Sequence, residues 1–226
     1  MQEPKLTNRL KAIYKHIVSG GAADIGTDHG YIPVRLALSA YPERLVASDV
    51  SSESLDKARQ TAVKHNVYDE IDFIHCDGLS DISPINLKNI IIAGMGGETI
   101  ATILSKAPWT SEDERLLILQ PMSKSDLLRE WLQQNSYYVL HEELCEDGKI
   151  YEIIIATGGN DVPYSPAEKL LGHIHLISSD PLYKRRLREL VEKTEKIAAV
   201  LKNSKKPKDS ERLKAQLQTL YQLQEL

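Results

Sequence analysis

The 226-residue sequence has few of the features that define several common classes of protein. Its two cysteines, Cys76 and Cys145, are too few for a disulfide scaffold or for a zinc site with the usual number of ligands. No apolar run approaches the roughly 18 residues that a membrane-spanning helix needs. Residues 1–5 lack the apolar core that would make them part of a secretory signal. We therefore expect a soluble, cytoplasmic globular protein that holds no metal and contacts no membrane.

Several catalytic patterns are also missing. The sequence contains no His-Glu-x-x-His pair, no phosphate-binding P-loop and no Ser, His and Asp in the chain order of a known hydrolase triad. Proteolysis, zinc chemistry and hydrolysis of nucleoside triphosphates therefore have no support.

Charge is distributed unevenly along the chain. The net charge is -4 overall, but it is -9 over residues 1–165 and +5 over residues 166–226. The join at residues 158–166 is rich in Gly, Pro, Asn and Asp, which favour turns. We predict an acidic domain over residues 1–160 and a basic one over residues 161–226. A basic tail indicates an anionic partner or, equally well, a solvated helical surface.

The larger part alternates between two kinds of apolar pattern. Short apolar runs predict strands at residues 22–25, 45–50, 71–76, 90–93, 116–119, 137–140 and 151–156. Helical patterns lie among them at residues 33–39, 52–65, 97–106 and 124–134. Strands that alternate with helices in this way predict a parallel sheet covered on both faces.

The end of the sheet departs from that pattern. Only Glu146-Asp147-Gly148-Lys149 separates a strand at residues 137–143 from one at residues 150–157, which leaves no room for a crossover helix. These two strands must form an antiparallel hairpin. A Rossmann-like α/β sheet that ends in such a hairpin is typical of class I methyltransferases, whereas a dinucleotide-binding domain continues with another parallel strand.

The sequence of residues 161–226 predicts a helical coiled coil. Tyr183, Leu187, Leu190, Thr194, Ile197 and Leu201 follow a spacing of four and three residues, and Leu213, Leu217 and Leu220 repeat it after a break. Two such seams predict an antiparallel helical hairpin, with a shorter helix at residues 166–178 at its base.

The loop after the first strand indicates which ligand the sheet binds. Its Gly26-x-x-x-Gly30 spacing is not the GxGxxG of a dinucleotide site, and Asp28 would repel a pyrophosphate. S-adenosylmethionine has no phosphate and carries a sulfonium and an ammonium, both of which acidic groups attract. Asp28 is also suited to cap the helix that follows, and both roles can hold.

Each of the next strands ends in residues suited to the same ligand. Asp49, with Val50 beside it, is 23 residues beyond Gly26, where a carboxylate accepts hydrogen bonds from ribose hydroxyls. Asp77 and Gly78 follow the third strand, where the carboxylate suits an adenine amino group; the alternative is a simple turn.

The fourth strand ends in a glycine-rich segment that contains Gly94 and Met95. Three glycines within four residues indicate that a ligand approaches the backbone closely. His29 and Tyr31 flank the same cleft, where the tyrosine ring is suited to stack on a base; packing in the fold is the alternative for both.

At this point the chain resembles the bacterial tRNA (adenine-22)-N1-methyltransferase family. The hallmark of that family appears here as Asp24-Ile25-Gly26-Thr27-Asp28-His29-Gly30-Tyr31-Ile32-Pro33. Further matches follow in the expected order, at Asn8-Arg9-Leu10 near the start and then at Ala47-Ser48-Asp49, Asp77-Gly78-Leu79, Ile92-Ala93-Gly94-Met95-Gly96-Gly97, Gln120-Pro121 and Tyr151-Glu152.

The resemblance implies methylation of N1 of an adenine in tRNA, with S-adenosylmethionine as cofactor. It makes Asp28 the first candidate for a catalytic carboxylate, with His29 second and Tyr31 at the target base. The cofactor would lie against Gly26, Asp28, Asp49, Val50, Asp77, Gly78, Gly94 and Met95. The residues expected to contact tRNA are Arg9, Lys184, Arg185, Arg186, Arg188, Lys205 and Lys206.

Three alternatives remain open from the residues. The first is a methyltransferase of a small molecule or protein whose helical hairpin serves dimerisation, although we expect a monomer. The second is an RNA-binding module without catalysis, which the acids at Asp28, Asp49 and Asp77 disfavour. The third is a NAD-dependent dehydrogenase, which Asp28 and the terminal strand hairpin disfavour.

Overall fold

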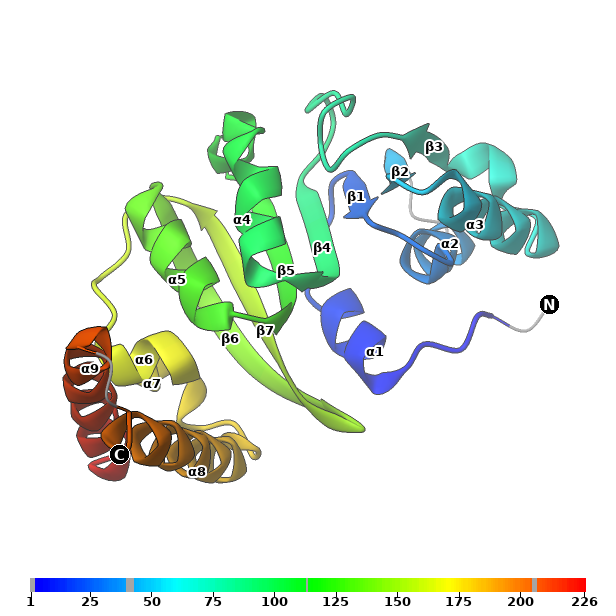
Figure 1. Cartoon of the computed structure of the whole chain (residues 1–226). Helices are drawn as coiled ribbons and strands as arrows, with labels where there is room; N and C mark the ends of the chain where they lie inside the picture. Colours follow the sequence, from blue (N-terminus) through cyan, green and yellow to red (C-terminus); the bar gives the residue numbers. More distant parts are fainter. Residues whose placement is uncertain (1–2, 40–42, 113, 205–206) are drawn as a thin grey trace.

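The computed structural model describes residues 3–39, 43–112, 114–204 and 207–226. A seven-stranded sheet forms its centre (Figure 1), in the order β3-β2-β1-β4-β5-β7-β6. The strands are β1 (Ala22–Ile25), β2 (Leu45–Asp49), β3 (Asp72–His75), β4 (Asn89–Gly96), β5 (Leu116–Ser123), β6 (Tyr137–Asp147) and β7 (Lys149–Gly158). All neighbouring pairs are parallel except those that involve β7.

Helices cover both faces of the sheet. Those of the sheet region are α1 (Asn8–Tyr14), α2 (Tyr31–Leu38), α3 (Ser52–Lys64), α4 (Gly97–Ser105) and α5 (Ser125–Gln134), with 3-10 turns at Tyr68–Glu70 and Pro108–Ser111. Successive residues of a strand point to opposite faces. Ile90 and Ile92 of β4 therefore pack in the cluster under α4 and α5, whereas Ile91 packs in the cluster under α1, α2 and α3.

The predicted antiparallel strand hairpin is confirmed, and its strands are longer than expected. β6 and β7 pair from Tyr137 with Gly158 to Asp147 with Lys149, so Gly148 alone forms the turn. The predicted strand end at residue 143 is wrong because the pairing continues through the buried Leu144 and Cys145 to the polar Glu146 and Asp147.

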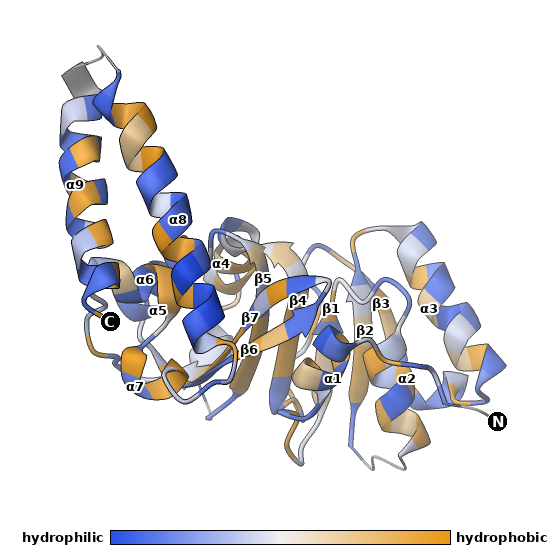
Figure 2. Cartoon of the chain, turned by 90° about the horizontal axis from the view of Figure 1, so that it is seen from below, coloured by the Kyte–Doolittle hydropathy of each residue, from blue (hydrophilic) through white to orange (hydrophobic). Residues whose placement is uncertain are grey.

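The C-terminal part consists of α6 (Pro166–Leu171), α7 (Ile174–Ile177), α8 (Tyr183–Lys202) and α9 (Pro207–Gln224). Figure 2 shows α8 and α9 side by side, which confirms the helical hairpin. Two positions of the predicted seams are wrong. On α8, Ala198 is buried in place of its neighbour Ile197, because the face that packs inward passes through residue 198. On α9, Leu217 is 49% exposed, because the inward face passes through Leu213 and Leu223.

A buried ionic network joins the helical hairpin to the sheet. Arg129 of α5, only 1% exposed, donates to Glu142 Oε1 at 2.7 Å and lies 3.0 Å from Glu152 Oε2. Arg186 of α8 donates from Nε to Glu152 Oε1 at 3.0 Å. Burial raises the pKa of Glu142 although Arg129 opposes the shift. At Glu152 burial acts in the same direction, but Arg129 and Arg186 together bring the pKa below its usual value.

None of the described helices is both long and apolar enough to cross a membrane.

Candidate functional site

Two adjoining cavities lie at the carboxyl ends of β1, β2 and β4. One has a volume of about 350 Å³ and the other about 250 Å³. Gly26, Ala93 and Gly94 line both cavities. This is the edge at which open α/β sheets bind ligands.

Two of the predicted glycines form the wall between the cavities. Gly26 has a φ of 72° and Gly94 a φ of 79°, a region that favours glycine. A Cβ atom on Gly26 would lie 2.2 Å from Cε of Met95, so Met95 packs directly across this loop. The Met95 side chain therefore fills the space beside Gly26, and a Cβ atom on Gly94 would lie 3.6 Å from Nη1 of Arg9.

Asp24 is a buried acid of the larger cavity to which sequence reasoning assigned no role. Thr27 Oγ1 donates to its Oδ2 at 2.7 Å. Burial raises the pKa of Asp24 to about 6, and the nearby Asp49 adds to this effect, while the hydrogen bond from Thr27 opposes it. Its position could have indicated a role, since Asp24 comes two residues before Gly26, but an acid at that position is also consistent with an ordinary strand residue.

Asp49 and Asp28 lie together, as their strand positions predict. The backbone N–H of Asp28 donates to Asp49 Oδ2 at 3.2 Å, and that of Ser51 donates to Asp49 Oδ1 at 2.8 Å. Asp28 does not cap the following helix, because Gly30 occupies the cap position and the helix begins at Tyr31. Its carboxylate is exposed at the larger cavity instead.

Asp77, Gly78, Val50 and Met95 line the smaller cavity, on both sides of Asp49. Asp77 pairs with Lys106, whose Nζ lies 2.8 Å from its Oδ2. Val50 is exposed at the lip of the cavity. An apolar side chain beside two carboxylates suits a flat heterocycle with polar edges.

His29 and Tyr31 lie at the larger cavity, and their rings stack with centroids 5.3 Å apart. His29 Nε2 is 3.6 Å from Asp28 Oδ2. The three candidate catalytic residues therefore form one group at the mouth of this cavity.

Arg9 also belongs to this cavity, rather than to a separate surface. Its Nη1 donates to Gln120 Oε1 at 2.6 Å, and the same oxygen accepts from the Gly94 N–H at 3.2 Å. The guanidinium lies 5.6 Å from the ring centroid of Tyr151. In the sequence, Gln120 and Arg9 occur in separate motifs of the resemblance, and no pattern links the two.

The basic residues predicted to contact RNA differ in their surroundings. Arg185 donates to Glu146 Oε1 at 2.9 Å, and Arg186 pairs with the buried Glu152. Lys184 and Arg188 are exposed on α8. Lys205 and Lys206 lie outside the described residues.

One group of potential metal ligands lies away from the cavities. Ligand atoms of His16, His141 and Glu143 are within 4.8 Å of one another. Glu143 already pairs with Lys15 and His16, at 2.6 and 2.7 Å. The absence of a metal stays a prediction.

Comparison with known proteins identifies relatives of this arrangement. A family model described as a methyltransferase domain matches residues 6–154. The tRNA (adenine(22)-N(1))-methyltransferase of Bacillus subtilis is 34% identical over 162 residues, which cover 71% of this chain and 68% of that protein.

Solved structures of two relatives extend the likeness to nearly the whole chain. The B. subtilis m1A22 tRNA methyltransferase TrmK has a TM-score of 0.86 and 27% identity, with 98% of each chain covered. M. capricolum TrmK, in complex with S-adenosylhomocysteine, has a TM-score of 0.79 and 23% identity, with 97% of this chain and 96% of that chain covered. At this identity the likeness supports a shared fold and nothing further.

Proposed function

The chain belongs to the methyltransferase-domain family and, within it, to the tRNA (adenine(22)-N(1))-methyltransferases, and we propose that it methylates N1 of adenine 22 in tRNA. The methyl donor is S-adenosylmethionine. The observation that carries the proposal is the row of carboxylates at the strand ends, which line the two joined cavities at Asp24, Asp28, Asp49 and Asp77.

The residues present fit that donor. In the smaller cavity we assign Asp49 to the ribose hydroxyls, and Asp77 and Val50 to the adenine. We assign the ammonium group to Asp24 in the larger cavity, and Gly26 and Gly94 line both cavities. No cradle of backbone N–H groups for a pyrophosphate is needed, because this donor has no phosphate.

The catalytic task of the chain is mainly positioning. When bound, S-adenosylmethionine supplies a methyl group activated by its sulfonium. Adenine N1 carries a lone pair in the ring plane and needs no deprotonation before it forms the new C–N bond. Holding N1 in line with the methyl group therefore supplies most of the rate enhancement.

Asp28, His29 and Tyr31 would act on the target base. Positive charge develops on the adenine ring as the C–N bond forms, and the exposed carboxylate of Asp28 is suited to stabilise it and then to take a proton from N6. His29, 3.6 Å from Asp28, is the second candidate for that proton. Tyr31 stacks with His29 and offers its ring to an extruded base.

Methyl transfer from labelled S-adenosylmethionine to unmodified bacterial tRNA tests the proposal, with the product identified by nucleoside mass spectrometry. We expect N1-methyladenosine at position 22, and no product on a matched tRNA in which G replaces A22. If a protein that binds the donor modifies neither tRNA, the function is wrong. A methyltransferase of a small molecule or protein, with the helical hairpin as a dimer contact, would then be favoured.

A further inference from the structure

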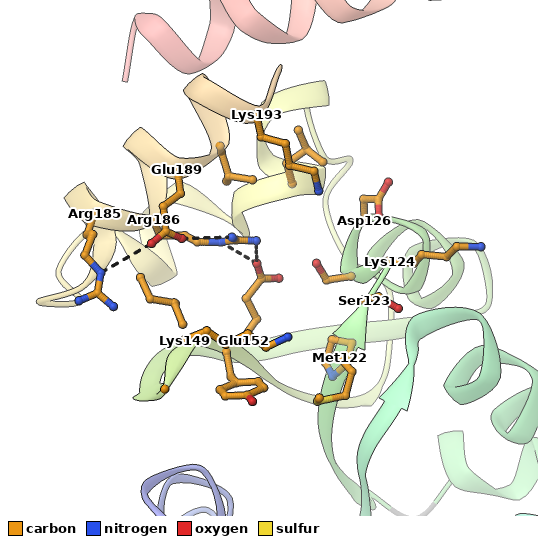
Figure 3. A pocket seen from close by; sticks show the side chains of 17 residues that line it. Met122, Ser123, Lys124, Asp126, Lys149, Glu152, Arg185, Arg186, Glu189 and Lys193 are labelled. Atoms are coloured by element: carbon orange, nitrogen blue, oxygen red, sulfur yellow. Dashed lines mark hydrogen bonds and ion pairs between the residues drawn. The ribbon is translucent and has the colours of Figure 1, made fainter. Parts of the chain in front are cut away.

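A third hollow, of about 490 Å³, opens between the end of β5, the β6–β7 hairpin and α8 (Figure 3). We call it the hairpin groove. Met122, Ser123, Lys149, Tyr151, Arg186 and Lys193 are among the residues that line it. A hollow of this size encloses a small ligand or a few linked groups and is too small to enclose a double helix.

The hairpin groove lies next to the larger of the two cavities at the strand ends, which we call the catalytic cavity because Asp28, His29 and Tyr31 line it. Its floor starts at Pro121 and Met122, directly after Gln120, whose side chain holds both Gly94 and Arg9. Tyr151 connects the two hollows, since Arg9 of the catalytic cavity lies 5.6 Å from its ring centroid and Lys149 of the groove lies 5.0 Å from it. A single strand that extends from the catalytic cavity past Arg9 and Tyr151 would reach the hairpin groove.

The positive charges of the groove divide into paired and free ones. Arg186 is held by Glu152, Arg185 by Glu146, and Lys124 by Glu98. Lys149 and Lys193 are exposed. Within the described part of the chain neither has an ion pair, and the Lys149 ammonium contacts only the ring of Tyr151, 5.0 Å from its centroid. Figure 3 shows Lys193 extending from α8 and Lys149 on the strand hairpin below it, so each wall of the groove carries a cation that is not neutralised by an acid among the described residues.

The helical periodicity of α8 separates this charge from the rest of the basic cluster. Arg186, Leu190 and Lys193 recur at spacings of four and three residues and face the groove. Lys184 and Arg188 lie on the opposite side of the same helix, because they are two residues from Arg186 in either direction.

We infer that the hairpin groove binds the single-stranded nucleotides that flank the target adenosine. Phosphates would lie against Lys149 and Lys193, and a base would stack on Tyr151. A groove with cations on its walls and an aromatic ring on its floor is the usual arrangement for single-stranded nucleic acid. The inference rests on the proposed function and assigns the contact to this groove rather than to the outer face of α8.

A pair of matched double variants tests the assignment. Lys149→Glu with Lys193→Glu changes the net charge by the same amount as Lys184→Glu with Arg188→Glu. We expect the groove pair to raise KM and Kd for tRNA at least tenfold, with kcat at saturating tRNA and the Kd of S-adenosylmethionine within about twofold of wild type. The outer-face pair should change the Kd of tRNA less than threefold.

Salt dependence provides a second readout. Each phosphate contact contributes about 0.7 to 0.9 to the slope of log Kd against log salt concentration. The groove pair, which removes two such contacts, should therefore lower that slope by roughly 1.4 to 1.8. Tyr151→Leu should also weaken binding of tRNA, and Tyr151→Phe should restore it, because the ring and not the hydroxyl stacks on the base.

Equal effects of the two double variants would overturn the inference, since they would show a general response to charge. Unchanged tRNA binding by the groove pair would also overturn it. Binding is measured by fluorescence anisotropy without turnover, so failure of the groove can be told apart from failure of the proposed function. In the latter case the wild-type protein itself would transfer no methyl group to tRNA.

Discussion

At the scale of single residues, the site depends on which carboxylates are exposed and which are buried. Asp28 and Asp77 are exposed, whereas Asp24 is buried and its pKa is raised to about 6. A buried acid of this kind must lose its proton before it can pair with an ammonium group, so its role depends on pH.

Affinity for S-adenosylmethionine should therefore fall below about pH 6. An ionised Asp24 pairs with the donor's ammonium, and the proton that binds at lower pH competes with it. We expect the Kd to rise toward tenfold for each pH unit below 6, as measured by titration calorimetry between pH 5 and 8. Asp24→Asn should bind more weakly and lose this pH dependence.

The control for this effect is Asp77→Asn. Asp77 is exposed and paired with Lys106, so its loss should weaken binding and leave the pH profile in place. A wild-type affinity that does not change from pH 5 to 8 would exclude Asp24 from the ammonium contact.

Asp28→Asn tests the catalytic carboxylate. The variant retains size and the backbone contact from Asp28 N–H to Asp49, so donor binding should stay within about threefold of wild type. We expect kcat to fall about 100-fold or more, in the range that acid–base groups contribute. A kcat near that of wild type, with full donor affinity, would remove Asp28 from the mechanism.

Sequence reasoning at this scale succeeded where a residue follows a strand. Asp49 is the last residue of β2 and Asp77 comes two residues after β3, and parallel strands bring their ends to one edge. No role was predicted for Asp24 because it lies inside β1, and because its burial, rather than its place in the sequence, makes it unusual. The contact of Gln120 with Arg9 joins residues 111 positions apart, which no local pattern encodes.

At the scale of elements, the packing of α8 against α9 shows the limits of periodicity. Leu213 and Leu217 both fit a heptad, yet only the first turns inward. The inward face of α9 includes polar Asp209 and Thr219, which hide the true stripe from an apolar pattern.

Two alanine variants of α9 should separate the true seam from the predicted one. Leu223 is 1% exposed in the cluster that joins the helical hairpin to α6, so Leu223→Ala should lower the free energy of unfolding by about 2–5 kcal/mol. Leu217→Ala should change it by less than about 0.5 kcal/mol. Urea denaturation followed by circular dichroism measures both, and equal losses would contradict the packing.

Strand positions were predictable because each buried strand is a short apolar run between helical patterns. The ends of the strands were harder to predict. β4 continues through Gly94-Met95-Gly96 as far as the first residue before α4, although glycines usually end a strand pattern. Its pairing with β5 is irregular there, which is a tertiary feature of the ligand-binding edge.

At the scale of the whole molecule, the buried network of Arg129, Glu142, Glu152 and Arg186 holds the helical hairpin against the sheet. Glu142 also accepts from the His173 N–H at 2.8 Å, and Arg129 donates to the Lys169 carbonyl at 3.0 Å. Neither acid can lose its cation without leaving a charge in the interior.

Arg129→Met should therefore be strongly destabilising. It leaves the buried Glu142 without the guanidinium that pairs with it, and we expect a loss of about 3–5 kcal/mol in the free energy of unfolding. The matched control is Lys169→Met, which breaks the partly exposed pair with Glu130 and should cost less than about 1 kcal/mol. A loss for Arg129→Met no larger than that of the control would show that the network contributes little.

The division of the chain near residue 160 stays a prediction, and the network argues that the two parts depend on each other. Composition and turn formers indicated where the chain changes character. They did not indicate that Arg186, expected at a nucleic-acid surface, would pair with Glu152 of the sheet. Opposite charges far apart in a sequence do not reveal whether they meet.

The same network has a consequence for modularity. Because its charges come from α5, both strands of the terminal hairpin and α8, a functional chimaera cannot be made by cutting the chain at the linker. Grafting this helical hairpin onto another methyltransferase would require the recipient to carry counterparts of Arg129, Glu142 and Glu152. A chimaera that keeps the fold must therefore transfer the residues of this interface together, as a set.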